Sequence, residues 1–514
     1  MTETVDRGNH TSDRQIWLAM IALMLIMLMS SLGQMIFSTA LPTIVGDLGG
    51  VSQMSWVITA FLLAQTIFMP ISGALADQMS KKVLLIIIVG IFMVGSAVGG
   101  LATTMSVLIV ARAIQGAAGG GLMIVSQALT AEIVSARDRG KYMGVMGAVF
   151  GVSSVLGPVL GGWFTDGPGW RWGLWLNIPL GLIAIGGVVA NIHVEKRARG
   201  RVVDVWGILT MAVGTSSLIL ATTWGGNNYP WASWQILSLF AVAIVFFAAF
   251  FVVERIVPAP IIPPELFSHP NFNLTTCAGI AVGIFMFGAM GYMPTFMQMV
   301  HALSPTVAGL MMTPMMVGLL MTSTLVGNLV TRYGRYKWYP VAGLAGTFVA
   351  LVLMGIIHAA TPLWLVGILL FFFGLALGAA MQILVLIVQN TFPVAMIGKA
   401  TASNNFFRQI GATLGASLVG GLFTGRLTGF MEERLPSAIA ALPPEEAAQF
   451  AGGLDTSHFT PASVVTLPQA IQLVIEGAYA DALLPIFLWL SPLALLAAGL
   501  LIFIREDPLK STIE

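Results

Sequence analysis

Charge and cysteine are what this sequence has least of. Only 9% of its 514 residues are charged, whereas a soluble protein of this size carries roughly a quarter. Hydrophobic residues make up 57% of the chain, and the mean hydropathy is +0.90. Water cannot solvate a folded chain with so much apolar surface, so we expect the lipid bilayer to be the solvent for most of it.

The single cysteine, Cys277, excludes an intramolecular disulfide and a cysteine-based metal site. The net charge of +1 gives no indication of a nucleic-acid partner. The glycine-rich run 116–121 is not followed by Gly-Lys-Ser or Gly-Lys-Thr, so it does not read as a phosphate loop. With no nucleophile–base pair, paired intramembrane carboxylates or metal-ligand spacing, we expect a protein that is not an enzyme and needs no cofactor or metal.

Apolar runs long enough to cross a bilayer recur along the whole chain. A spanning helix needs about 20 mostly apolar residues, and on this criterion we predict an all-α membrane protein with fourteen transmembrane helices. The predicted spans are 16–38, 53–74, 84–102, 105–127, 142–164, 172–193, 205–224, 234–253, 272–298, 305–329, 339–358, 363–388, 402–424 and 482–504.

The basic residues test this count. If the N-terminus lies inside, 18 of the 23 Lys and Arg residues fall in cytoplasmic segments, and only Arg171, Arg426 and Arg434 fall in outer loops. This asymmetry follows the positive-inside rule, and a miscounted helix would invert it downstream. The pattern therefore predicts a multi-pass protein of the bacterial inner membrane with both termini cytoplasmic.

One polar segment occurs twice, each time between two apolar runs. The first copy, 73–82, reads Gly-Ala-Leu-Ala-Asp-Gln-Met-Ser-Lys-Lys, and the second, 327–337, reads Gly-Asn-Leu-Val-Thr-Arg-Tyr-Gly-Arg-Tyr-Lys. Any short cytoplasmic loop collects Lys and Arg, but here glycine, leucine and a base recur in register. Such a repeat is typical of a duplicated membrane bundle. The matching positions are Gly73 with Gly327, Leu75 with Leu329 and Lys81 with Arg335.

These features predict three parts. We expect an N-terminal six-helix bundle in 1–194, a charged linker with two inserted helices in 195–258, and a C-terminal six-helix bundle in 259–514. The last bundle contains a long outer segment, 427–480, before its final helix. The composition of that segment allows either short amphipathic pieces on the membrane or a loop without regular structure.

Several motifs together resemble one family. Segment 73–82 resembles the Gly-x-Leu-Ala-Asp-Arg-x-Gly-Arg-Lys signature of the major facilitator superfamily, and Arg112-Ala-Ile-Gln115-Gly116 is similar to its arginine motif. The stretch 151–162 resembles its antiporter motif, with Gly151, Gly157, Pro158, Gly161 and Gly162. Trp170-Arg171-Trp172, Asn177-Ile-Pro179 and Gln389-Asn-Thr-Phe-Pro393 resemble the fourteen-helix drug:proton antiporter branch. The resemblance covers nearly the whole chain and implies two six-helix bundles that rock about a central cavity.

The sequence departs from that branch at one position that bears on coupling. The first helix of the branch carries an aspartate where this chain has Gly33, and by the predicted spans no acidic residue lies in the middle of any helix. A carboxylate there would neutralise Arg112 and carry a proton. We therefore expect the chain to couple to protons weakly.

Arg112 is the most distinctive intramembrane residue. It is predicted ~10 Å below the outer end of its helix, and Gly33 is expected at a comparable depth. A buried base is a functional-site hypothesis by default, although an arginine can also snorkel or donate to backbone carbonyls. The same two readings apply to Arg408, ~10 Å from the inner end of its helix. The residues expected to line the substrate cavity are Gly33, Gln34, Phe37, Trp56, Arg112, Gln115, Gln382, Gln389, Asn404 and Arg408.

The charges of the repeated segment predict a gate on the inner side. Pairs between the ends of neighbouring helices that form in one state and break in the other are a bistable element; ordinary loop charges are the plainer explanation. The inner-gate set is Asp77, Lys81, Lys82, Glu132, Arg137 and Arg335. The antiporter-motif glycines, with Pro158, would permit close helix packing and a kink.

We expect a secondary transporter that exports amphiphilic, often cationic, compounds by alternating access, with proton exchange as the coupling. The alternative in the same fold is an exporter or flippase of lipids or other amphiphiles with weak proton coupling. The expected partners are small amphiphilic substrates, protons and membrane lipids, and the expected state is a monomer.

Overall fold

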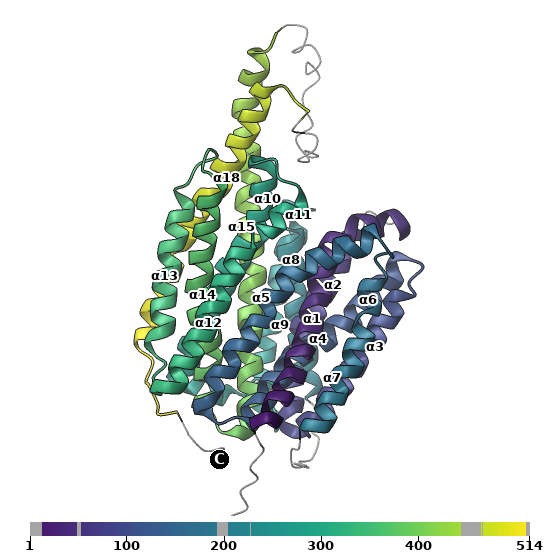
Figure 1. Ribbon diagram of the computed structural model, residues 1–514, viewed down its shortest axis with the longest axis vertical. Coiled ribbons are helices and arrows are strands. Elements are labelled where there is room, and N and C mark those ends of the chain that lie inside the picture. The colour runs from purple at the N-terminus through teal and green to yellow at the C-terminus, as the bar shows by residue number, and fades with distance from the viewer. Residues whose placement is uncertain are drawn as a thin grey trace, which may run out of the picture.

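The computed structural model describes residues 13–48, 53–192, 204–226, 228–443, 464 and 466–509, and within these ranges it is almost entirely helical. Two groups of helices are joined side by side (Figure 1). The first group consists of α1 (Asp13–Leu48), α2 (Met54–Gln78), α3 (Lys81–Gly100), α4 (Met105–Ile133), α5 (Ala136–Asp166), α6 (Trp172–Trp175) and α7 (Asn177–Asn191).

The second group follows two intervening helices, α8 (Val205–Trp224) and α9 (Trp234–Ile256), and a 3-10 turn, η2 (Pro264–Ser268). A further 3-10 turn, η3, spans Val394–Met396 and precedes α15. The helices of the second group are α10 (Pro270–Val300), α11 (Pro305–Leu310), α12 (Thr313–Tyr333), α13 (Trp338–Gly355), α14 (Leu363–Thr391), α15 (Ile397–Ala440) and α18 (Gln469–Ile502).

The two groups meet mainly along two helix pairs, α2 with α15 and α5 with α12. We call the end where α1, α3 and α5 begin and α18 ends the basic end, and the opposite end the distal end. The groups converge at the basic end, at the bottom of Figure 1, and splay apart toward the distal end. By the distribution of Lys and Arg, the basic end is predicted to be cytoplasmic.

Thirteen helices in the described part of the chain are long and apolar enough to cross a membrane. The predicted span that is missing from this set, 142–164, corresponds to α5, a 31-residue helix packed against α1 and α12. Two predicted spans are each built from two helices: 172–193 is interrupted at Leu176 and 305–329 at Met311 and Met312. At the second break Pro314 opens α12, a position where its missing N–H costs nothing.

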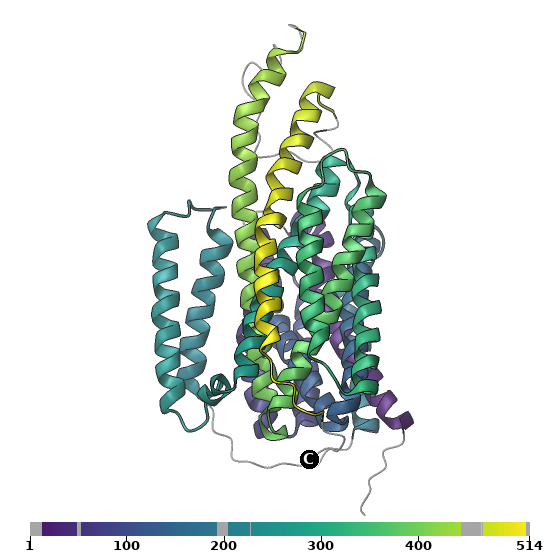
Figure 2. The same cartoon turned by 90° about the vertical axis from the view of Figure 1, so that its left-hand side faces the viewer.

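The inserted pair α8 and α9 lies at the edge of the molecule, as Figure 2 shows at its left side. Its main packing is internal, with weaker contact to α2 and α15. The outer face of α9 exposes large apolar side chains such as Ile244 and Val245, as expected for a lipid-facing helix. At its basic end the buried Glu254 accepts hydrogen bonds from Ile261 N and Ile262 N, which fixes the chain as it turns toward α10.

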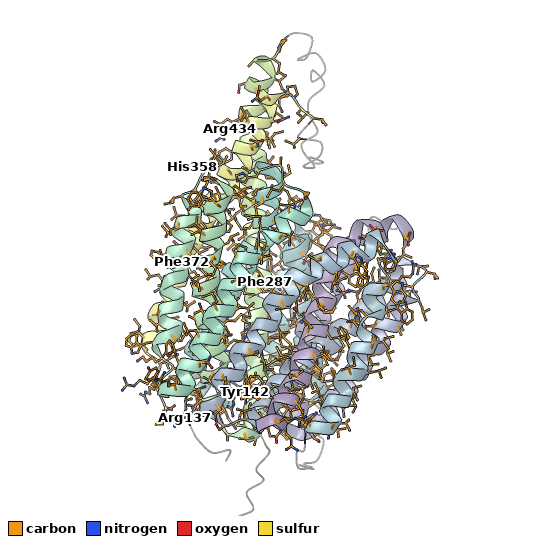
Figure 3. All side chains as sticks on the ribbon, in the orientation of Figure 1. Arg137, Tyr142, Phe287, His358, Phe372 and Arg434 are labelled. Carbon is orange, nitrogen blue, oxygen red and sulfur yellow. The ribbon has the colours of Figure 1, made fainter. Side chains whose placement is uncertain are left out.

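The long outer segment is a continuation of two helices, and neither expectation for it fits its described parts. Helix α15 runs on to Ala440 and α18 begins at Gln469, so the pair projects well beyond the other helices (Figures 1 and 2). Met431, Leu435, Ile471 and Ile475 bury against one another, and Arg434, near the top of Figure 3, forms an ion pair with Asp481 at 2.6 Å. Residues 444–463 and 465 lie outside the described residues, as does most of the 195–204 linker.

Candidate substrate cavity and its closure

A central cavity lies at mid-height between the two helix groups. Its walls come from α1, α2, α4 and α5 on one side and from α10, α14 and α15 on the other, with Phe287 at the centre of Figure 3. Six methionines give it a soft apolar lining. The lining residues are Met27, Ser30, Ser31, Gln34, Gln65, Met69, Met123, Met146, Val149, Val282, Gly283, Met286, Phe287, Met381, Gln382, Arg408 and Gln409.

Arg112 is buried inside the first helix group and is not among the residues that line this cavity. Its guanidinium lies 4.2 Å from the ring centroids of both Phe37 and Phe61. Nη1 donates to Gly33 O at 2.7 Å and to Gln115 Oε1 at 3.1 Å, and Nε donates to Val57 O at 3.3 Å. Carbonyl acceptors and ring faces therefore hold the cation without a carboxylate.

Gly33 contacts Arg112, in agreement with their comparable predicted depth, and Gln115 contacts Arg112 as well. The surroundings of Gly33 limit where a side chain at that position could lie. A Cβ on Gly33 would lie 3.0 Å from Phe92 Cζ, so a side chain there starts out against that ring and away from open space. Gln115 also donates to Ser96 Oγ at 2.7 Å. Gln34, which is expected to line the substrate cavity, does line it.

Trp56 lies apart from the central cavity. Its ring packs edge-on against Trp224, with 6.2 Å between the centroids, and so joins the distal end of α2 to the inserted helix α8. The sequence does not show which face of α2 carries Trp56, because α2 is apolar nearly all round.

A buried polar network lies on the basic-end side of the cavity and crosses between the groups. Asn405 Nδ2 donates to Gln127 Oε1 at 3.1 Å, and Gln389 Nε2 donates to Thr401 Oγ1 at 3.3 Å and, at the distance limit, to Gln127 O. Asn404 donates to Thr276 within the second group. Gln389 and Asn404 thus belong to the floor below the cavity, and Gln127 is a member that the sequence did not single out.

Asp77 closes the basic end by capping a helix of the other group. Its carboxylate accepts from Gly398 N at 3.0 Å and from Lys399 N at 2.8 Å, two amides in the first turn of α15. A carboxylate at a helix N-terminus satisfies unpaired N–H groups and complements the helix dipole. The contact from α2 to α15 therefore holds the two groups together.

Glycines let the backbones of the two helix groups touch at both of the helix pairs that join them. A Cβ on Gly73 would lie 2.3 Å from Ala402 Cβ and 2.7 Å from Gly398 O, and a Cβ on Gly327 would lie 2.2 Å from Gly140 O. These are the crossings of α2 with α15 and of α5 with α12. The repeated glycines, Gly73 and Gly327, thus occupy equivalent crossings in the two halves.

Of the remaining gate charges, the two lysines have partners in their own helix group. Lys81 pairs with Glu132 at 3.0 Å and Lys82 donates to the carbonyls of Val189 and Ile192, all within the first group. Arg137 Nε donates to Thr331 O at 3.2 Å, which does cross between the groups. Arg335 is exposed.

The antiporter-motif glycines divide between two packing surfaces of α5. A Cβ on Gly157 would lie 2.3 Å from Met35 Cβ of α1, whereas the same atom on Gly151 would meet Met316 O of α12 at 3.6 Å. Gly161 accepts a hydrogen bond from Thr165 Oγ1, and a Cβ on Gly162 would meet nothing within 4 Å. The side chain of Pro158 lies outside the described residues.

At the distal end, the Trp170-Arg171 pair joins α1 to α3. Asp47 accepts from Trp170 Nε1 at 3.0 Å and from Arg171 Nη1 at 3.2 Å, and Arg171 Nη2 donates to Ala102 O. These hydrogen bonds, that of Trp170 first, hold the pKa of Asp47 below its ordinary value. The first group is thus braced at its distal end without involving the second.

Comparison with known proteins agrees with this architecture. The family model of the Major Facilitator Superfamily matches residues 23–416. The chain belongs to the major facilitator superfamily. It is therefore a multi-pass membrane protein of a transporter family.

Among its relatives is the multidrug transporter protein MdtP of Bacillus subtilis, 34% identical over 95% of this chain and 92% of the relative. An uncharacterized MFS-type transporter of Mycobacterium tuberculosis is 39% identical over 95% of this chain and 69% of the relative. The solved proton:xylose symporter XylE aligns with a TM-score of 0.59 at 15% identity over 97% of each chain. The last likeness concerns the fold alone.

Proposed function

We propose that this transporter exports amphiphilic compounds from the cytoplasm by alternating access. The observation that carries the proposal is a central cavity with an apolar lining and a few polar groups, closed toward the predicted cytoplasmic side by contacts between two helix groups. Relatives named multidrug transporter protein MdtP and multidrug resistance protein 3 support it.

The closing contacts suit a reversible gate because each of them is weak. A carboxylate cap contributes about 1 kcal/mol, and the glycine crossings are van der Waals contacts without ion pairs. A few such contacts can be exchanged for others when the groups rock, as alternating access requires. In the state seen here the cavity would release its contents at the distal end, where the groups splay apart (Figure 1).

We propose exchange for protons as the coupling, and the lining of the cavity defines the alternative. No Asp or Glu is found among the residues that line the cavity, so substrate and proton do not compete for one carboxylate there. This observation favours the second candidate, an exporter of lipids or other amphiphiles with weak proton coupling.

Sealed inverted vesicles containing the purified protein test both candidates. Uptake of amphiphilic dyes is measured with and without an imposed pH gradient, against vesicles that lack the protein. Uptake that collapses with the gradient supports antiport, and gradient-independent exchange supports the alternative. If vesicles with and without the protein take up the dyes equally, the export proposal fails.

A further inference from the structure

The polar lining of the central cavity has one cation and no anion. Arg408 is its charged residue, and the other polar groups are Gln34, Gln65, Gln382, Gln409, Ser30 and Ser31. In the described part of the chain, ion pairs join Lys81 to Glu132, Arg171 to Asp47 and Arg434 to Asp481. Arg408 takes part in none of them, so its charge is not neutralised by a carboxylate.

Arg408 is held in position by neutral groups. Its Nη2 donates to Asn405 Oδ1, and Asn405 is fixed in turn by Thr401 O at 2.9 Å and Gln127 Oε1 at 3.1 Å. A guanidinium has five N–H donors, and this bond uses one of them. Because Arg408 lines the cavity, its remaining N–H donors can bind a ligand there.

Comparison with Arg112 shows why Arg408 is the binding group. Arg112 packs against two phenylalanine rings, donates to three protein acceptors and does not line the cavity. Arg408 is only partly buried and faces a space bounded by Met286, Phe287 and Met381.

The physical consequence is selection by charge. A guanidinium in a low-dielectric cavity repels a cation and forms strong, often bidentate hydrogen bonds with carboxylate, phosphate or sulfonate oxygens. The methionines and Phe287 provide the apolar surface for the rest of the molecule. The cavity therefore has the chemistry of a site for an apolar body with an acidic head.

We propose that the preferred substrates are anionic amphiphiles whose acidic head group binds Arg408. This inference rests on the proposed export function and names its substrate class. The same chemistry is offered by a free lipophilic acid and by the head group of an anionic lipid, and the experiment separates the two.

The first arm measures equilibrium binding to the purified protein and so does not depend on transport. Anilinonaphthalene sulfonate and phenylnaphthylamine share one aromatic body and differ by the sulfonate, which isolates the head group. We expect Arg408→Gln to weaken binding of the sulfonate by about tenfold or more, and Arg408→Lys to restore most of it because the charge returns. Binding of the neutral probe should change by less than about twofold.

Arg426→Gln is the matched control, because Arg426 lies on the same helix outside the cavity and donates to Asp481 O and Ala482 O. It should leave both affinities unchanged. Melting temperatures of all variants show that each protein is folded. Equal affinities of wild type and Arg408→Gln for the sulfonate would overturn the proposal, as would tighter binding of ethidium than of the sulfonate to the wild type.

The second arm identifies the source of the acidic group. Proteoliposomes are assayed for export of anilinonaphthalene sulfonate and, separately, for movement of fluorescent phosphatidylglycerol between leaflets. Loss of either activity in Arg408→Gln, with return in Arg408→Lys, supports the substrate class and assigns it to a free acid or a lipid. Binding that depends on Arg408 without transport of any probe would refute the export function while leaving the anion site standing. Transport of both probes that is unchanged in Arg408→Gln would overturn the proposal.

Discussion

At the scale of single residues, the glycines at the helix crossings determine how closely the two groups approach. Gly73 and Gly398 face each other, and a Cβ on either would overlap with backbone or side-chain atoms of the opposing helix at less than 3 Å. A larger side chain at either position would therefore destabilise the closed crossing and favour an arrangement in which α2 and α15 are further apart.

Gly73→Val should therefore shift the protein toward the state with an open basic end. We expect the export rate to fall by about tenfold while the protein remains folded, because the clash of about 1–3 kcal/mol exists only in the closed arrangement. Dye export and melting temperature measure the two effects. Gly90→Ala on α3 is the control, since a Cβ there would meet nothing within 4 Å. Unchanged export in Gly73→Val would show that this crossing does not govern the cycle.

Gly33 is the second residue with a specific consequence. Gly33→Asp should provide Arg112 with a carboxylate and make export depend more steeply on the pH gradient, since the new group can carry a proton. The ring of Phe92 lies 3.0 Å from the position of the added Cβ, so Gly33→Asp combined with Phe92→Leu should show the larger effect. Vesicle export measured at several pH gradients tests this. Identical gradient dependence in wild type and both variants would place coupling elsewhere.

At the scale of secondary-structure elements, Asp77 joins α2 to the first turn of α15. Asp77→Asn removes a negative charge from the N-terminus of α15 and leaves one side-chain oxygen for two amides, which should cost about 1 kcal/mol. A loss of that size shifts a two-state equilibrium about fivefold toward the open basic end. Disulfide crosslinking between introduced cysteines on α2 and α15, with Cys277 replaced by serine, should slow accordingly. Crosslinking and export that both match the wild type would refute the role given to Asp77.

The inserted helices α8 and α9 should be dispensable for substrate binding. Ile244 and Val245 are exposed on α9, so Ile244→Ala and Val245→Ala should leave dye affinity and export within about twofold of the wild type. Glu254→Ala, which removes the acceptor for Ile261 N and Ile262 N, should instead lower the melting temperature. A substrate bound mainly by residues 205–253 would contradict this assignment.

Much of this arrangement could be predicted from sequence because its cause is local. The spans follow from apolar runs. The equivalence of Gly73 and Gly327 follows from the repeated segment, which places a glycine at the corresponding helix crossing in each half. The partners of Asp77 could not be predicted, because they are the backbone amides of residues 398 and 399. Almost every residue has such an amide, so the residue type does not show which ones bind a carboxylate. The length of α15 and α18 was missed because Met431, Leu435, Ile471 and Ile475 bury against each other outside the bilayer, where a hydropathy criterion does not apply.

At the scale of the whole molecule, two helix groups enclose the central cavity, touch through α2–α15 and α5–α12, and splay apart at the distal end. If the groups move as bodies, closing one end must open the other. The central claim is this reciprocity, because export through the cavity depends on it.

Distances between spin labels at both ends of one protein test the claim most directly. With Cys277 replaced by serine, one pair is placed at the exposed positions Asp138 and Tyr333 of the basic end, and another at Thr43 and Val307 of the distal end. In the wild type we expect a short basic-end distance and a long distal-end distance. Gly73→Val should lengthen the first and shorten the second. A change at one end alone, or the same direction of change at both, would contradict alternating access through this cavity.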